Sequence, residues 1–138
     1  MRWLATTALI LVLLAATSPL GAEDDARKKF LLELGKSLTS GNSGAVAAHF
    51  PGDKKVELSL RGVKRGRYRS GQAKSLLATY LSRTIQPIKY VLKDVRGSVG
   101  KFSMEYRVRA DGRRVTGTTC VYLEESGDSW NIVGIVEY

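Results

Sequence analysis

The chain has 138 residues, and 22 Lys and Arg against 13 Asp and Glu give it a formal net charge of +9 at pH 7. This length suits one compact domain, and the positive charge favours acidic partners. With a single cysteine, Cys120, and a single histidine, His49, it can form no intramolecular disulfide and lacks the usual zinc ligand sets, so we expect no metal and no cofactor.

The first 22 residues have the layout of a secretory signal peptide. Arg2 precedes an apolar run over residues 4–16, and a small residue, Ala22, follows. A helix needs about 20 apolar residues to span a bilayer, and this run is shorter. We therefore predict a signal peptide over residues 1–22, export to the periplasm or the medium, and a mature domain over residues 23–138 with no transmembrane segment. The alternative is an uncleaved amphipathic or anchoring helix.

Two helices are predicted at the start of the mature domain. Residues 24–38 carry apolar side chains at helical spacing behind an acidic start, which suits a helix N-terminus. Gly41 can then adopt the left-handed conformation that ends a helix. Asn42 or Ser43 is expected to cap a second helix over residues 44–50.

A β-hairpin is predicted next. Residues 56–60 alternate between apolar and polar side chains, and Gly62 permits a tight turn. We predict that Leu60 pairs with Lys64, which places Leu58 opposite Gly66. Val56 then lies opposite Tyr68, so that the apolar side chains of both strands share one face and the intervening arginines point to water.

The rest of the chain is predicted to form one helix and four strands. Ser70 is expected to cap a helix that runs to about Arg83, and after Pro87 the sequence is typical of a four-strand meander. The last strand is apolar on both faces, as in a strand covered on both sides. Helices can cover one side, and we predict that a homodimer covers the other through Ile132, Val133, Ile135 and Val136.

This order of elements predicts an α+β fold with three helices packed on a bent antiparallel sheet of about six strands. The stretches "SGNSGAVAAHF", "VELSLRG", "GRYRSGQAKSLL" and "GSVGKFSMEYRV" resemble a family of small exported bacterial proteins of unknown function with a nuclear transport factor 2-like, or cystatin-like, cone. The resemblance covers about residues 30–138. It implies that cone, in which the matching residues are structural, and it implies no catalytic residues.

A set of basic residues surrounds the hairpin and the start of the following helix. We predict that the chain is a non-catalytic binding or scaffold module and that this set contacts an anionic lipid, glycan or protein surface of the cell envelope. Tyr68 points inward, so the exposed aromatic platforms of a single-strand nucleic-acid site are missing. The alternative is a solvated sheet edge that discourages aggregation. The set comprises Arg61, Lys64, Arg65, Arg67, Arg69 and Lys74.

The second functional hypothesis is a small isomerase or dehydratase, because the cone is similar to that of ketosteroid isomerase. Such an enzyme needs a carboxylate base and a hydrogen-bond donor inside an apolar cavity. The candidate base is Asp94, on the strand face that carries Ile88, Tyr90 and Leu92. The candidate donors are Tyr80, Tyr106 and Tyr122, and His49 is a further candidate base.

Each of these candidates also has a structural interpretation. Asp94 would lie in water at a strand end, paired with Lys93 or Arg96, and His49 would cap its helix or join the core. Cys120 is expected to be a buried, inert thiol. A cone filled by large side chains would argue against an enzyme, the expected set being Phe50, Leu77, Tyr80, Tyr106 and Trp130.

Overall fold

The computed structural model describes residues 19–138, so residues 1–18 of the predicted signal peptide lie outside the described residues. Residues Leu31–Tyr138 form one compact unit. Within the described part of the chain, no helix is both long enough and apolar enough to cross a membrane.

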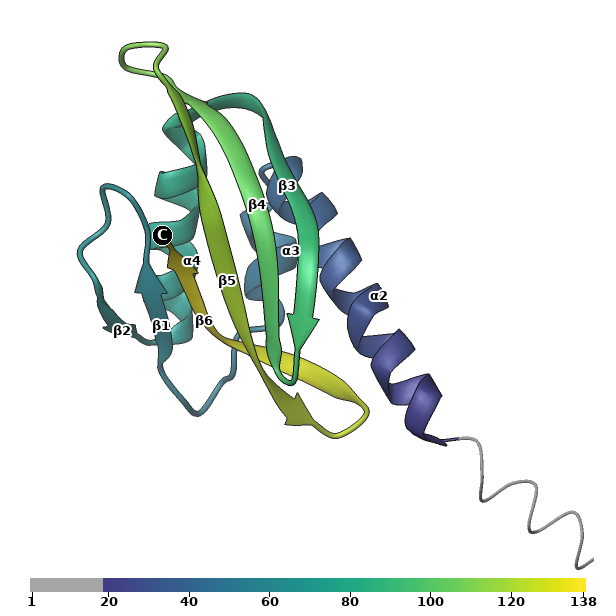
Figure 1. Ribbon diagram of the computed structural model, residues 1–138. Helices are drawn as coiled ribbons and strands as arrows, with labels where there is room; N and C mark the ends of the chain where they lie inside the picture. The colour runs from purple at the N-terminus through teal and green to yellow at the C-terminus, as the bar shows by residue number, and fades with distance from the viewer. Residues whose placement is uncertain (1–18) are drawn as a thin grey trace, which may run out of the picture. The chain divides into compact units, whose positions relative to one another are not determined.

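Three helices are described (Figure 1): α2 over Pro19–Thr39, α3 over Ser43–Ala47 and α4 over Ser70–Ser82. The helix α2 begins five residues before the predicted start, so the acidic residues are not in its first turn. Gly41 has the expected positive φ of 72°. The side chain of Asn42 accepts a hydrogen bond of 3.1 Å from the backbone N–H of Ala45, which confirms Asn42 as the cap of α3.

The predicted role of Ser70 as a helix cap is wrong. The helix α4 begins at Ser70 itself, and the N-cap is Arg69, whose side chain makes no capping hydrogen bond. The Ser70 hydroxyl instead donates to the carbonyl of Pro51. Ser70 therefore ties the start of α4 to the loop that precedes the first strand.

The sheet has six strands in the order β2-β1-β6-β5-β4-β3. Neighbouring strands are antiparallel except β1 and β6, which pair in parallel. The predicted α+β class and the four-strand meander are confirmed, and the parallel pair joins the hairpin to the meander. The strands are β1 Val56–Ser59, β2 Gly66–Tyr68, β3 Thr84–Arg96, β4 Val99–Val108, β5 Arg114–Ser126 and β6 Ser129–Glu137.

The hairpin has the predicted register over most of its length. Leu58 lies opposite Gly66, and Val56 lies opposite Tyr68. The ladder ends there, because the chain turns at Leu60, whose carbonyl accepts a hydrogen bond of 3.0 Å from the Val63 N–H. The predicted pairing of Leu60 with Lys64 is therefore absent.

Within Leu31–Tyr138, the helices α3 and α4 and residues 31–39 of α2 cover one face of the sheet, which we call the inner face (Figure 1). Leu58, Ile135 and Val121 form a row across β1, β6 and β5 on this face, and all three are buried. The helix α2 approaches β4 so closely that a Cβ atom at Gly100 would lie 2.6 Å from Leu31 Cδ2. The core is the space between this face and the helices.

The final strand contains a register shift that sequence alternation did not indicate. Leu123 pairs with Ile132 whereas Tyr122 pairs with Gly134, so Val133 is an extra residue in β6. Ile132, Ile135 and Val136 are buried within this one chain. The apolar character of β6 is thus largely accounted for by the chain itself, and the homodimer stays a prediction.

Candidate functional site

A groove lies on the outer face of the sheet, the face opposite the helices. Arg67, Glu57, Gly134 and Tyr122 are aligned across β2, β1, β6 and β5. Gly134 has no side chain, and a Cβ there would lie 3.3 Å from Tyr122 Cδ2. Tyr122 therefore packs closely over the backbone of Gly134. The cavity has a volume of about 580 Å³ and is lined by Lys54, Lys55, Glu57, Arg67, Tyr122, Glu124, Val133 and Gly134, which we call the basic groove.

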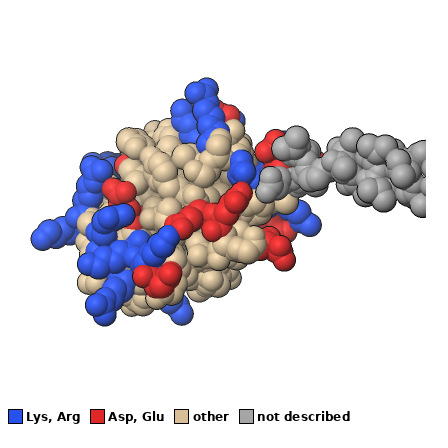
Figure 2. Space-filling model, turned by 90° about the horizontal axis from the view of Figure 1, so that it is seen from below, with Lys and Arg blue, Asp and Glu red and all other residues tan. Residues whose placement is uncertain are grey.

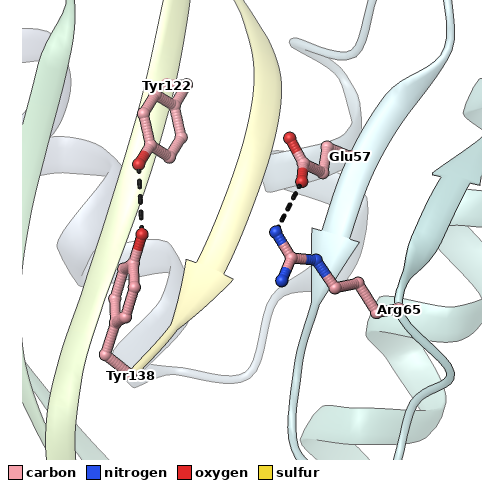
Figure 3. Close-up of polar contacts among 4 residues, drawn as sticks. All are labelled: Glu57, Arg65, Tyr122 and Tyr138. Atoms are coloured by element: carbon pink, nitrogen blue, oxygen red, sulfur yellow. Dashed lines mark hydrogen bonds and ion pairs between the residues drawn. The ribbon is translucent and has the colours of Figure 1, made fainter.

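Two ion pairs border the basic groove. Lys54 pairs with Glu124, and this hydrogen bond raises the pKa of the Lys54 ammonium. Arg65 pairs with Glu57 at 3.4 Å between Nη2 and Oε1 (Figure 3). Both pairs are largely exposed, so each contributes little to stability. Both carboxylates that line the groove, Glu57 and Glu124, therefore already have a cationic partner.

Two tyrosines extend the outer face beside the groove. The hydroxyls of Tyr122 and Tyr138 lie 3.4 Å apart (Figure 3). This hydrogen bond, more than burial, raises the pKa of Tyr122 to about 12. Tyr122 was a candidate hydrogen-bond donor inside the cone, but it faces outward instead.

Lys55 and Arg67 give the groove its unbalanced positive charge. Both side chains are exposed, and neither makes an ion pair with any described residue. Figure 2 shows Lys and Arg side chains gathered at the left of the view, the side on which Figure 1 draws the β1–β2 hairpin. Asp and Glu side chains lie among them. The groove is therefore a mixed but net basic surface.

The six predicted basic residues do not form one site. Arg67 lines the groove and Arg65 reaches it through Glu57, whereas Arg61 lines a different cavity. The other three, Lys64, Arg69 and Lys74, are exposed and line neither cavity. The sequence interpretation missed Lys54 and Lys55, although a basic pair directly before a strand is a visible signal.

A carboxylate inside the protein was also missed. Glu137, near the end of β6, accepts a hydrogen bond of 2.8 Å from the hydroxyl of Tyr80 and one of 3.4 Å from that of Tyr106. The backbone N–H of Arg61 donates to the same carboxylate at 3.2 Å. The sequence signal is an acidic residue two positions after buried Ile135, on the apolar face of a core strand.

The two tyrosines that hold Glu137 are buried and pack edge to face, with ring centroids 5.9 Å apart. Burial raises the pKa of the Tyr80 hydroxyl far above its ordinary value. Burial also raises the pKa of Tyr106, and the nearby Glu137 carboxylate adds to the effect. Both hydroxyls therefore remain protonated donors at neutral pH.

A second cavity, of about 190 Å³, lies beside these tyrosines. Its lining combines aromatic and aliphatic side chains with three arginines, and we call it the arginine-rimmed cavity. The residues that line it are Arg61, Gly62, Tyr80, Arg83, Thr84, Tyr106, Val108 and Arg113.

The predicted placement of Asp94 on the inner face is wrong. A register shift in β3 pairs Leu92 with Phe102 but Asp94 with Lys101, which moves Asp94 to the outer face. Its carboxylate accepts a hydrogen bond of 2.8 Å from Arg96 Nε. This is the strand-end ion pair of the structural interpretation, far from the interior that a base would need.

His49 and Cys120, the remaining candidates, are also not placed beside the buried tyrosines Tyr80 and Tyr106. His49 follows α3, and its carbonyl accepts a hydrogen bond of 2.7 Å from the Ile132 N–H. Cys120 is half-buried rather than buried, because it lies on the outer face beside Asp94 and Lys101. Across residues 19–138, no group of three or more His, Cys, Asp and Glu side chains could hold a metal ion.

No protein-family model matches the sequence, and no curated protein matches it. Several solved structures, however, have a similar fold. The structure is similar to a suggested dehydratase of the nuclear transport factor 2-like family from Streptomyces avermitilis, with a TM-score of 0.61 and 12% identity, over 86% of this chain and 97% of the other.

A protein of the DUF4783 family from Bacteroides ovatus has a TM-score of 0.58 and 10% identity, over 75% and 89% of the two chains. An NTF2-like protein of unknown function from Cytophaga hutchinsonii has a TM-score of 0.54 and 13% identity, over 81% and 88%. The chain has the nuclear transport factor 2-like fold. The predicted resemblance is confirmed, and at these identities it concerns the fold alone.

The interior of this nuclear transport factor 2-like domain is mostly filled. Phe50, Leu77, Tyr80 and Tyr106 are buried as expected, and Trp130 is half-buried. The remaining space beside Tyr80 and Tyr106 is smaller than the about 300–1,000 Å³ of typical ligand pockets. The larger hollow is the basic groove, on the opposite face of the sheet.

Proposed function

We propose that this chain is an exported, non-catalytic binding module that holds an anionic component of the cell envelope in its basic groove. The observation that carries the proposal is the pair Lys55 and Arg67, two exposed cations on the wall of a 580 Å³ groove whose carboxylates are paired with Lys54 and Arg65. A phosphate, sulfate or carboxylate group would meet positive charge there without displacing an existing ion pair. Export rests on the signal-like pattern of residues 1–22.

The proposal is tested by retention on heparin and on vesicles that contain an anionic phospholipid, each measured against salt concentration. Binding should weaken as salt rises, because screening shortens the range of the attraction to about 8 Å at physiological ionic strength. The double variant Lys55→Gln, Arg67→Gln should elute at clearly lower salt than the wild type. Preference for heparin or for vesicles distinguishes a glycan from a lipid as the anionic component.

The matched control is Lys36→Gln, Lys93→Gln, which removes the same charge from two exposed lysines that do not line the groove. If the control variant elutes as early as the groove variant, retention reflects net charge and the proposed groove is wrong. Equal retention of the groove variant and the wild type contradicts it too.

A second function, a small isomerase or dehydratase, is favoured by the contact of Glu137 with Tyr80 and Tyr106. A carboxylate can remove a proton next to a carbonyl, and a protonated tyrosine can donate to the enolate oxygen. The test is deuterium exchange at the carbon between the carbonyl and the double bond of a β,γ-unsaturated cyclohexenone, followed by NMR. Exchange should be lost in Glu137→Gln, and an absence of exchange above background with the wild type would count against this function.

A further inference from the structure

The arginine-rimmed cavity has a cluster of positive charge among its lining residues. Arg61, Arg83 and Arg113 line it together, and no carboxylate is among its lining residues. The Arg83 guanidinium donates a hydrogen bond of 2.9 Å to the carbonyl of Gly62, which explains its position structurally. The side chains of Arg61 and Arg113 are exposed and make no hydrogen bond or ion pair with any described residue. Two carboxylates lie nearby, since Glu137 and Asp111 accept hydrogen bonds from the backbone N–H groups of Arg61 and Arg113, but two negative charges leave the three arginines net positive.

The inner wall of the cavity is different in character. Tyr80 and Tyr106 both direct their hydroxyls to Glu137, so their hydrogen-bonding groups are already engaged. The Glu137 carboxylate has a third donor in the Arg61 N–H. These tyrosines and Val108 therefore offer mainly ring and aliphatic surface to an occupant.

From this arrangement we infer that the cavity is a binding site for a small organic anion. The apolar body of the ligand would lie against Tyr80, Tyr106 and Val108, and its carboxylate or phosphate would bind at the rim to Arg61 and Arg113. Guanidinium groups suit this role because their planar fork of donors matches a carboxylate or phosphate. The volume of about 190 Å³ limits the ligand to a compact molecule.

This site is separate from the basic groove, since no residue lines both cavities. The inference therefore goes beyond the proposed function and does not depend on it. It also needs no catalysis by Glu137, which acts here only by holding the two tyrosines.

The experiment is an NMR titration of the isotope-labelled wild-type domain with benzoate, and with benzyl alcohol as a neutral probe of similar size and shape. Benzoate should shift the signals of Val108 and Thr84, and benzyl alcohol should bind more weakly. Arg61→Gln and Arg113→Gln should each weaken benzoate binding about tenfold, the change expected for a lost charge-assisted hydrogen bond. Neither side chain has a structural partner in the described part of the chain, so both variants should fold.

Lys93→Gln is the matched control, because it removes one exposed positive charge that does not line the cavity. It should leave benzoate binding unchanged. Equal affinity for benzoate and benzyl alcohol would overturn the inference, as would shifts confined to Lys55 and Arg67 or an equal effect of the control. Heparin retention of the Lys55→Gln, Arg67→Gln variant tests the groove separately, so failure at one site is distinguishable from failure at the other.

Discussion

The hydroxyl of Tyr80 on α4 donates a hydrogen bond of 2.8 Å to the carboxylate of Glu137 on β6. This contact joins two residues that are 57 positions apart in the sequence and attaches α4 to the central part of the sheet. The donor is the hydroxyl of a buried tyrosine, and the acceptor is a carboxylate. Hydrogen bonds to charged groups contribute more to stability than those between neutral groups.

Tyr80→Phe should lower the free energy of unfolding by about 1–2 kcal/mol, because Glu137 loses its shortest hydrogen bond and keeps two weaker donors. Tyr106→Phe is the matched control, since its hydrogen bond to Glu137 is 3.4 Å long. It should cost clearly less. Urea unfolding of both variants measures the difference, and equal losses would contradict the ranking.

The protein should lose stability in alkaline solution as its buried tyrosines begin to titrate. Burial raises the pKa of Tyr80, Tyr90 and Tyr106 in the folded chain above the about 10 of an unfolded tyrosine. Above about pH 10 the unfolded state has lost these protons and the folded state still holds them. The free energy of unfolding should therefore fall with rising pH, by up to about 1.4 kcal/mol per pH unit for each such tyrosine.

Urea unfolding between about pH 8 and about pH 11 checks this slope. Tyr80→Phe removes one of the three groups and should make the alkaline slope shallower than in the wild type. Tyr68→Phe would not serve as a control, because the hydroxyl of the half-buried Tyr68 donates to the Lys64 carbonyl. Tyr138→Phe would not serve either, because the Tyr138 hydroxyl lies 3.4 Å from that of Tyr122 and raises its pKa. The control is Gly71→Ala, which changes no titratable group and should leave the alkaline slope as in the wild type. A wild-type slope of zero in this range would contradict the prediction.

Much of the fold could be predicted from local sequence patterns because alternation and turn chemistry act over short distances. The register of Leu58 against Gly66 followed from placing apolar side chains on one face, and the cap at Asn42 followed from side-chain chemistry. The parallel pairing of β1 with β6 could not be derived in this way. It depends on the packing of two segments whose paired residues, such as Glu57 and Gly134, are 77 positions apart in the sequence.

The candidate site was harder to predict because strand alternation fails at bulges. One extra residue in β3 moved Asp94 from the inner to the outer face, and one in β6 brought Ile132 and Ile135 to the same side. Glu137 was overlooked although its position after Ile135 puts it on the inner face. Both Asp94 and Glu137 follow an apolar residue by two positions, and they differ only because β3 has a register shift between Leu92 and Asp94 whereas β6 has none between Ile135 and Glu137.

Gly100→Ala should destabilise the protein by about 1–3 kcal/mol, the usual cost of overfilling a packed core. The added Cβ would lie 2.6 and 2.9 Å from the two Cδ atoms of Leu31, and Leu31 is fully buried, so it has little space to move away. Thermal unfolding measures the loss. A variant as stable as the wild type would show that α2 is free to shift away from β4.

Gly71→Ala is the matched control, and the opposite sign is expected. Gly71 lies in the first turn of α4, and a Cβ there would meet no atom within 4 Å. Because glycine costs up to about 1 kcal/mol relative to alanine in a helix, the substitution should raise the free energy of unfolding by a few tenths of a kcal/mol to about 1 kcal/mol. If both alanine variants were destabilised equally, the loss at Gly100 would reflect a general intolerance of change rather than the close approach of Leu31.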